Sequence, residues 1–219
     1  AHENAAGRAR QLAPFAEVIV EPFGDIWLRD TGPIIVGSGS QRRAQGFGFN
    51  GWGGKYDLAG DQDIGERLAR QAGLAFARAD WVLEGGAIDH DGTGTVVTTE
   101  QCLLNPNRNS LSRAEIEERL RRDLGFERVV WLGSGLLNDH TDGHVDNLAR
   151  FVAPGVVSCP VAFGRDDPNA AVYDHTARLL AEATDARGEK LQVVRIPSPG
   201  RIGDEDGEII PASHMNFLI

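Results

Sequence analysis

The chain has 219 residues, and 22 Lys and Arg against 32 Asp and Glu give it a formal net charge of −10 at pH 7. With 41% hydrophobic and 25% charged residues, it has the composition of a globular protein that buries a core without disulfides. The acidic balance argues against a nucleic-acid partner, and no apolar run approaches the ~18 residues of a membrane span. Two cysteines fit a reducing compartment, so a cytoplasmic location is expected.

The first predicted helix covers roughly residues 64–72, where Asp61 or Asp63 caps its start and Gly73 ends it. Segments rich in Val, Ile and Phe lie before, between and after the predicted helices and indicate strands. They cover residues 47–49, 95–99, 129–131, 148–152, 156–159 and 192–196.

The second predicted helix covers residues 113–124 and has the clearest start signal. Ser112 is its N-cap, and Glu115 at the third helical position completes a capping box. Ile116, Leu120 and Leu124 repeat every four residues along one face, and Gly125 supplies the left-handed stop.

The third predicted helix starts with Pro168 at its first position and ends near Gly188. Its expected buried residues are Val172, Leu179, Leu180 and Ala183. No linker or low-complexity tract separates the elements, so the chain is interpreted as a single α/β unit.

The predicted elements repeat in the order strand, turn, strand, helix, strand, and each copy opens with a polar, glycine-rich stretch. The openings are Trp27–Gly32, Leu83–Gly86, Thr141–Asp146 and Ile210–Asn216. Val18–Val20 is interpreted as the tail of an earlier copy. The order predicts ββαβ modules that bury their cores against their neighbours, with the openings meeting at a common centre.

The openings supply acids and one histidine: Asp30, Glu84, His144 and Asp146. If His144 and Asp146 lie in an extended strand, their side chains leave the same face. Such a cluster can hold a cation and move a proton. Taken singly, each residue has a structural alternative: a salt bridge for Asp30, a turn for Glu84, a structural histidine for His144.

A metal centre is a competing interpretation, with ligands drawn from His140, Asp142, His144, Asp146, His90 and Asp91. No HExxH helix is present and no other ligand spacing on a predicted helix supports it, so no metal is expected. Cys102 and Cys159 both have apolar neighbours and no adjacent basic residue, and they are expected to be buried, inert thiols.

Together these stretches resemble the agmatine deiminase family, close relatives of the bacterial peptidyl-arginine deiminases among the guanidine-modifying (pentein) enzymes. The matching segments are Trp27–Pro33, Phe49–Tyr56, Leu83–Gly86, Thr98–Asn109, Thr141–Asn147 and Pro211–Phe217. The resemblance implies a five-bladed α/β propeller of ββαβ modules. Residues 1–219 would be one catalytic domain of this kind, incomplete at both ends, lacking its N-terminal part and its C-terminal nucleophile segment.

The resemblance also implies roles for individual residues. Asp30 and Asp146 would clamp a substrate guanidinium, His144 would carry protons, and Glu84 would hold both the guanidinium and His144. Trp27, Asn50 and Trp52 would contribute to substrate binding. A cysteine thiolate would attack the guanidinium carbon, and no metal or organic cofactor would be needed.

The nucleophile is expected after Ile219, because neither Cys102 nor Cys159 matches its position, so the 219 residues alone are expected to be inactive. The expected substrate is agmatine, hydrolysed to N-carbamoylputrescine and ammonia. A peptidyl-arginine deiminase, a non-catalytic guanidinium-binding protein and a metallohydrolase remain as alternatives. Self-association to a homo-oligomer is left open.

Overall fold

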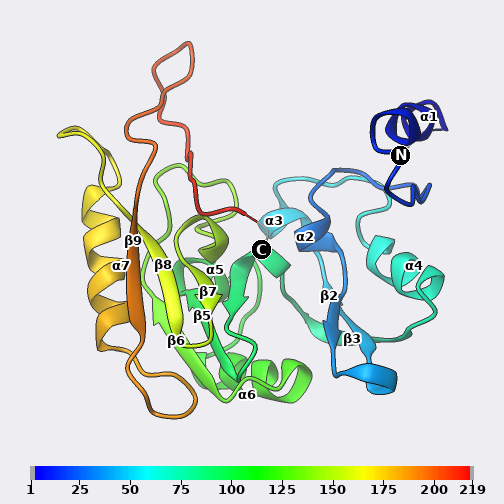
Figure 1. Cartoon of the computed structure of the whole chain (residues 1–219), viewed down its shortest axis with the longest axis horizontal. Coiled ribbons are helices and arrows are strands. Elements are labelled where there is room, and N and C mark those ends of the chain that lie inside the picture. The colour runs from blue at the N-terminus through cyan, green and yellow to red at the C-terminus, as the bar shows by residue number, and fades with distance from the viewer. Residues whose placement is uncertain (1–2, 218–219) are drawn as a thin grey trace. The chain divides into compact units, whose positions relative to one another are not determined.

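The computed structural model describes residues 3–217, and the chain divides into two compact units, Ala1–Val82 and Leu83–Ile219. Among the described residues there are three sheets of three strands each, one in the first unit and two in the second (Figure 1). No helix in this part of the chain has the length and hydropathy that crossing a membrane requires. The prediction that residues 1–219 form one catalytic domain stays a prediction.

Each sheet is one ββαβ module, as the order of elements predicts. Its first two strands are antiparallel, and the third returns parallel to the second after a crossover helix. The first module contains β1 (Ile34–Val36), β2 (Arg43–Gly48), α4 (Ile64–Gln71) and β3 (Ala75–Val82). The second contains β4 (Ile88–His90), β5 (Thr95–Thr99), α6 (Arg113–Leu124) and β6 (Arg128–Leu132). The third contains β7 (Arg150–Ala153), β8 (Val156–Val161), α7 (Ala170–Glu182) and β9 (Gln192–Pro197).

Short helices occupy the ends of the strands. One precedes the first strand of each module: α2 (Leu28–Thr31), η2 (Gly85–Ala87) and η3 (Val145–Asn147). In the first two modules another follows the second strand: α3 (Gly51–Gly54) and α5 (Glu100–Leu103). The remaining helices are α1 (Glu3–Leu12) and η1 (Gly39–Gln41). Three of the four polar openings of the repeat are therefore single helical turns placed just before the first strand of a module.

Helix α6 confirms its prediction at both ends. The Ser112 side chain accepts a hydrogen bond from the backbone N–H of Glu115, whose carboxylate accepts one from the backbone N–H of Ser112 at 2.8 Å. Gly125 follows with φ of 80°, a conformation that glycine adopts without strain. Ile116 and Leu120 are both fully buried, as their spacing predicts.

Helix α7 is shorter than predicted at both ends. It begins after Asn169 rather than at Pro168, and it ends at Glu182, well before Gly188. Ala183 is already extended, and Asp185 then accepts backbone N–H bonds from Arg187 and Glu189. These local bonds satisfy the backbone in a turn and so compete with continuation of the helix.

Two further stretches form no strand in the described part of the chain: Val18–Val20, interpreted as the tail of an earlier copy, and the apolar, strand-like stretch that begins at Met215. Val18–Val20 has no sheet partner, and Met215–Phe217 follows a bend. The prediction for the end of the latter stretch, Leu218 and Ile219, lies outside the described residues.

A hydrophobic cluster of buried residues joins the second and third modules. It combines side chains of β5 and β6 with side chains of β8 and α7, and α7 packs beside β8 and β9 (Figure 1). Its fully buried members include Val97, Leu132, Val157, Cys159 and Leu180. Within this unit, adjacent modules therefore share one core, as expected for repeats that cannot bury an apolar face alone.

Candidate active site

The predicted acids and histidine all lie at the short helices that open the modules. Asp30 is in α2, Glu84 immediately precedes η2, and His144 immediately precedes η3, which contains Asp146. The prediction that His144 and Asp146 lie in one extended strand is wrong. The backbone N–H groups of Leu148 and Ala149 both bond to the Val145 carbonyl, at 2.8 and 2.7 Å, and close a turn before β7 begins.

In the first unit, Asp30 is oriented by an indole. The Nε1 of Trp52 donates a hydrogen bond to Oδ2 of Asp30 at 2.9 Å. Trp52 is only 5% exposed and packs edge-on against Phe49 and Tyr56, with ring centroids 4.9 and 5.7 Å away. Its φ of 54° is unusual for a bulky residue and marks local backbone strain. The surroundings thus hold this indole against the Asp30 carboxylate.

The other two predicted substrate-binding residues of this unit, Asn50 and Trp27, lie at the starts of the short helices α3 and α2. The side chain of Asn50 accepts a hydrogen bond from the Gly53 N–H at 2.9 Å and so caps α3. Gly51 is required at the next position, because a Cβ there would lie 1.6 Å from the Tyr56 carbonyl oxygen. Trp27 is 54% exposed at the start of α2.

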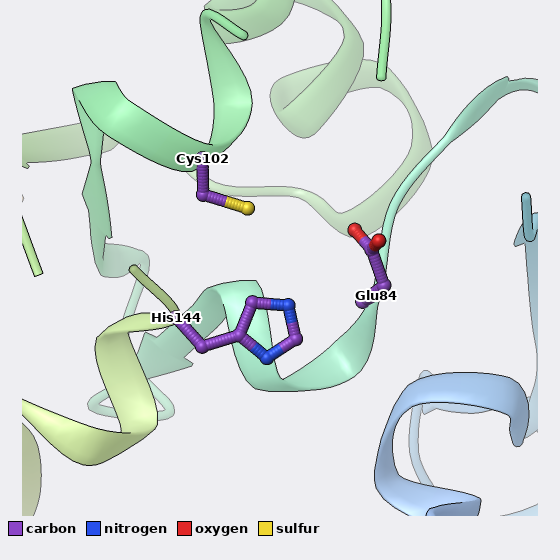
Figure 2. Close-up of side chains that lie close together, drawn as sticks. All are labelled: Glu84, Cys102 and His144. Atoms are coloured by element: carbon purple, nitrogen blue, oxygen red, sulfur yellow. The ribbon is translucent and has the colours of Figure 1, made fainter. Parts of the chain in front are cut away.

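In the second unit, the structure brings Glu84 and His144 together, and it adds Cys102. One potential ligand atom from each of the three side chains lies within 4.8 Å of the others. Figure 2 shows the thiol, the imidazole and the carboxylate directed toward a common space. All three residues are buried, with exposed fractions of 0% for Glu84 and Cys102 and 2% for His144. A carboxylate and an imidazole this close together and shielded from water can hold a cation and transfer protons.

Arg108 fixes one side of this cluster, and sequence reasoning did not single it out. Its Nε donates to Oε1 of Glu84 at 2.6 Å, its Nη1 to Oδ2 of Asp142 at 2.6 Å, and its Nη2 to the Thr141 carbonyl at 2.8 Å. Burial opposes its charge, but attraction to Glu84 and the hydrogen bonds to Asp142 and Glu84 raise the pKa of Arg108. No charge pattern along the chain distinguishes this arginine from those on the surface; only its place in the Asn-Pro-Asn-Arg-Asn loop sets it apart.

The loop that leads into His144 is strained and strongly held. Asp142 has φ of 60°, which is costly for a residue with a side chain, and its Oδ2 accepts bonds from Arg108 and from Asn107. Thr99, at the end of β5, donates to the Gly143 carbonyl at 2.6 Å. The backbone N–H of His144 donates to Oγ1 of Thr141 at 3.1 Å. These bonds hold the backbone of His144 in place and so fix the position of its imidazole in the cluster.

Asp146 is held by the segment that follows the third module. It is 3% exposed, and its Oδ2 accepts from Nδ2 of Asn216 at 3.1 Å. Ser213 anchors the same segment by donating to the Asn147 carbonyl at 2.7 Å. Arg150 adds a further link by donating to the Phe217 carbonyl at 2.7 Å. Ser213 and Asn216 of the fourth opening therefore bind η3 by hydrogen bonds.

Both thiols are buried, as predicted. Burial raises the pKa of Cys159 to about 11, and burial together with the nearby carboxylate of Glu84 raises the pKa of Cys102 well above its usual value. Neither thiol is therefore set up as a thiolate nucleophile in this structure. Within the alternating stretch considered for metal binding, Asp142 is paired with Arg108.

Comparisons with known proteins give a consistent answer. A family model described as Porphyromonas-type peptidyl-arginine deiminase matches residues 1–219. The chain is 42% identical over 207 residues to the agmatine deiminase of Pseudomonas aeruginosa (strain LESB58), covering 91% of this chain and 56% of the relative. It is 41% identical over 236 residues to a Vibrio parahaemolyticus protein provisionally named agmatine deiminase, covering 97% of this chain and 66% of the relative. An X-ray structure of another provisionally named agmatine deiminase superposes with a TM-score of 0.91 at 33% identity, covering 99% of this chain and 65% of that one. The chain thus spans between about half and two thirds of the length of these relatives, and it shares their α/β fold.

Proposed function

Because the chain belongs to the Porphyromonas-type peptidyl-arginine deiminase family, we propose that the protein it represents is an agmatine deiminase. It would hydrolyse the guanidinium group of agmatine to give N-carbamoylputrescine and ammonia. The names of the similar proteins support this substrate. An arginine side chain in a peptide carries the same reactive group and is the alternative substrate.

The observation that carries the proposal is the buried pair of Glu84 and His144. Arg108 holds Oε1 of Glu84, while Oε2 is buried and has no hydrogen-bond partner among the described residues. A guanidinium is a planar cation with five N–H donors and stays charged at any working pH. A buried carboxylate oxygen facing an imidazole suits such a donor, because a charged hydrogen bond satisfies the otherwise unpaired atom.

The remaining roles follow from the family resemblance and are part of the proposal. Asp30, oriented by Trp52, and Asp146, oriented by Asn216, would accept the other N–H groups of the guanidinium. Trp27 and Asn50 would contribute to the walls of the binding site. Because Asp30 and Asp146 would share one delocalised cation in this proposal, loss of either acceptor would weaken binding without changing the chemistry.

The proposed reaction has two stages. A cysteine thiolate attacks the guanidinium carbon, and the carbon–nitrogen bond breaks as His144 gives a proton to the departing ammonia. The product is a covalent amidino-thioether. His144 then takes a proton from water, whose oxygen attacks the same carbon, and the carbon–sulfur bond breaks to release the ureido product and the thiolate. Since both thiols of the chain are buried with raised pKa values, the thiolate is proposed to come from another cysteine of the whole protein.

The test is ammonia release from agmatine by the full-length protein in the presence of a metal chelator. The rate for His144→Ala should fall by ~100-fold or more, the usual size of a lost general acid–base group. His175→Ala, on the exposed face of α7, is the matched control and should keep the normal rate. Turnover of arginyl peptides without turnover of agmatine would move the assignment to the peptidyl-arginine activity. An unimpaired His144→Ala enzyme would contradict the proposed role of His144.

A further inference from the structure

The cluster formed by Glu84, Cys102 and His144 has a composition that guanidinium binding does not require. A thiol, an imidazole and a carboxylate are the three side-chain types that zinc takes as ligands, and three protein ligands with an open fourth position is its usual arrangement outside structural sites. In this cluster one ligand atom of each type lies within 4.8 Å of the other two (Figure 2). The thiol is the decisive member, because the proposed chemistry assigns no task to it.

A second observation comes from the carboxylate. Oε2 of Glu84 is buried, has no hydrogen-bond partner among the described residues, and belongs to a side chain with no exposed surface. Its orientation is fixed, because Arg108 binds the other oxygen at 2.6 Å. A buried acceptor without a donor is rare in native structures, and a bound cation is one of the groups that would satisfy it.

The backbone positions of the other two ligands are also held. The N–H of Cys102 donates to Oγ1 of Thr99 at 3.2 Å in the first turn of α5, and the N–H of His144 donates to Oγ1 of Thr141. The ligands thus come from three separate segments, each anchored by its own hydrogen bonds. Such supporting contacts orient metal ligands and raise affinity.

Charge balance also favours a divalent cation over a monovalent one. Arg108 is the cation in contact with Glu84, and it is shared with the carboxylate of Asp142. When the Cys102 sulfur bonds to the metal it releases its proton to solvent, so the thiolate and the Glu84 carboxylate together match the charge of Zn²⁺. Binding then needs no change of oxidation state.

We propose that Glu84, Cys102 and His144 form a binding site for one thiophilic divalent cation of the Zn²⁺ type, and that the bound cation inhibits the enzyme. The inhibitory part rests on the proposed function, because the metal would occupy the carboxylate and imidazole assigned to the guanidinium and to proton transfer. The bound cation is therefore regulatory and takes no part in the hydrolysis.

The binding test uses the full-length protein, freed of metal by a chelator and then titrated with Zn²⁺ in a calorimeter and with Co²⁺ in a spectrophotometer. One equivalent should bind, and Co²⁺ should give the near-ultraviolet charge-transfer band of a cobalt–thiolate bond. Cys102→Ser, Cys102→Ala and Glu84→Gln should each weaken binding by roughly 10–100-fold or more, and the Cys102 variants should lose the band. Cys159→Ser, which alters the other buried thiol, is the matched control and should retain both signals. Thermal unfolding identifies any variant that fails to fold.

The outcomes separate this inference from the proposed function. Zn²⁺ that binds with unchanged affinity to both Cys102 variants, or a wild-type protein that binds no equivalent, would overturn the metal site even if agmatine is hydrolysed normally. Conversely, a protein that shows the cobalt–thiolate band but hydrolyses no guanidine compound would contradict only the proposed function. If the metal site and the proposed function are both correct, Zn²⁺ should raise the apparent KM for agmatine, and the chelator should reverse the effect.

Discussion

Replacing Arg108 with Met tests whether one buried guanidinium organises the candidate site. The substitution removes the three donors that reach Glu84, Asp142 and the Thr141 carbonyl. The side chains of Arg108 and Glu84 have no exposed surface, whereas that of Asp142 is 20% exposed. The variant therefore leaves the Glu84 carboxylate buried without its counter-ion. It also leaves the Asp142 carboxylate, which solvent reaches only in part, without its partner.

The expected cost follows from this burial. Breaking a buried ion pair by removing one partner destabilises by about 3–5 kcal/mol, because the remaining charge stays in a poorly solvated place. For a chain of this size, 1 kcal/mol corresponds to about 2–4 °C, so the apparent melting temperature should fall by roughly 6–20 °C. The melting temperature of Arg108→Lys should lie between those of the wild type and of Arg108→Met, because one ammonium cannot match the geometry of three separate acceptors.

Differential scanning calorimetry of the full-length protein measures this shift, and a double-variant cycle identifies its cause. Adding Glu84→Gln to Arg108→Met should recover part of the loss, because the buried carboxylate is then neutral. Arg121→Met is the control, because Arg121 pairs with Glu118 on the exposed face of α6. This variant should have the melting temperature of the wild type. A melting temperature for Arg108→Met that is equal to that of Arg121→Met would refute the reasoning, as would strictly additive effects in the cycle.

Three further predictions concern the fold. Ser112→Ala should cost about 0.5–2 kcal/mol in chemical denaturation, since it removes the cap of α6, and no loss would show that the capping box is irrelevant to stability. Leu180→Ala should cost about 2–5 kcal/mol because Leu180 is fully buried in the core cluster, while Leu137→Ala, at a position 48% exposed, should cost much less; equal costs would contradict the assigned core. Burial and the nearby Asp167 raise the pKa of Tyr173 from 10.0 to about 12. Between these values the unfolded chain ionises first, so the stability present below pH 10 should fall by roughly 2–3 kcal/mol as the pH rises to 12. Tyr173→Phe should flatten this slope, and an unchanged slope would mean that another group causes it.

Much of the fold could be predicted because its signals are local. The ββαβ order, the cap and stop of α6 and the strands around residues 95–99 and 192–196 follow from propensities and turn residues within a few positions. The short strands β1 and β4 were not predicted, since three residues give no measurable alternation. The longer strand β3 was not predicted either, because its Ala, Arg and Asp residues carry little strand preference. The end of α7 was misplaced because Gly188 lies in a turn held by Asp185.

The candidate site was predictable only in part. Repetition of the openings identified Glu84, His144 and Asp146 as equivalent positions, and the structure places Glu84 beside His144. The assumption of an extended strand at His144 failed, because the chain turns into η3 instead. Cys102 and Arg108 were not assigned to the site, since their roles depend on partners far away in the chain.

The sequence by itself determined the charge, the modular order of strands and helices, and the family resemblance, all of which depend on residue types and short spacings. Only the tertiary structure decided that the thiol of Cys102 faces Glu84 and His144, and that Arg108 holds this carboxylate against the Asp142 loop. The reason is physical. Chain-local patterns record the preferences of the backbone, whereas the pairing of buried charges is fixed by where strands from different modules end and by the cost of leaving any of those charges unmatched.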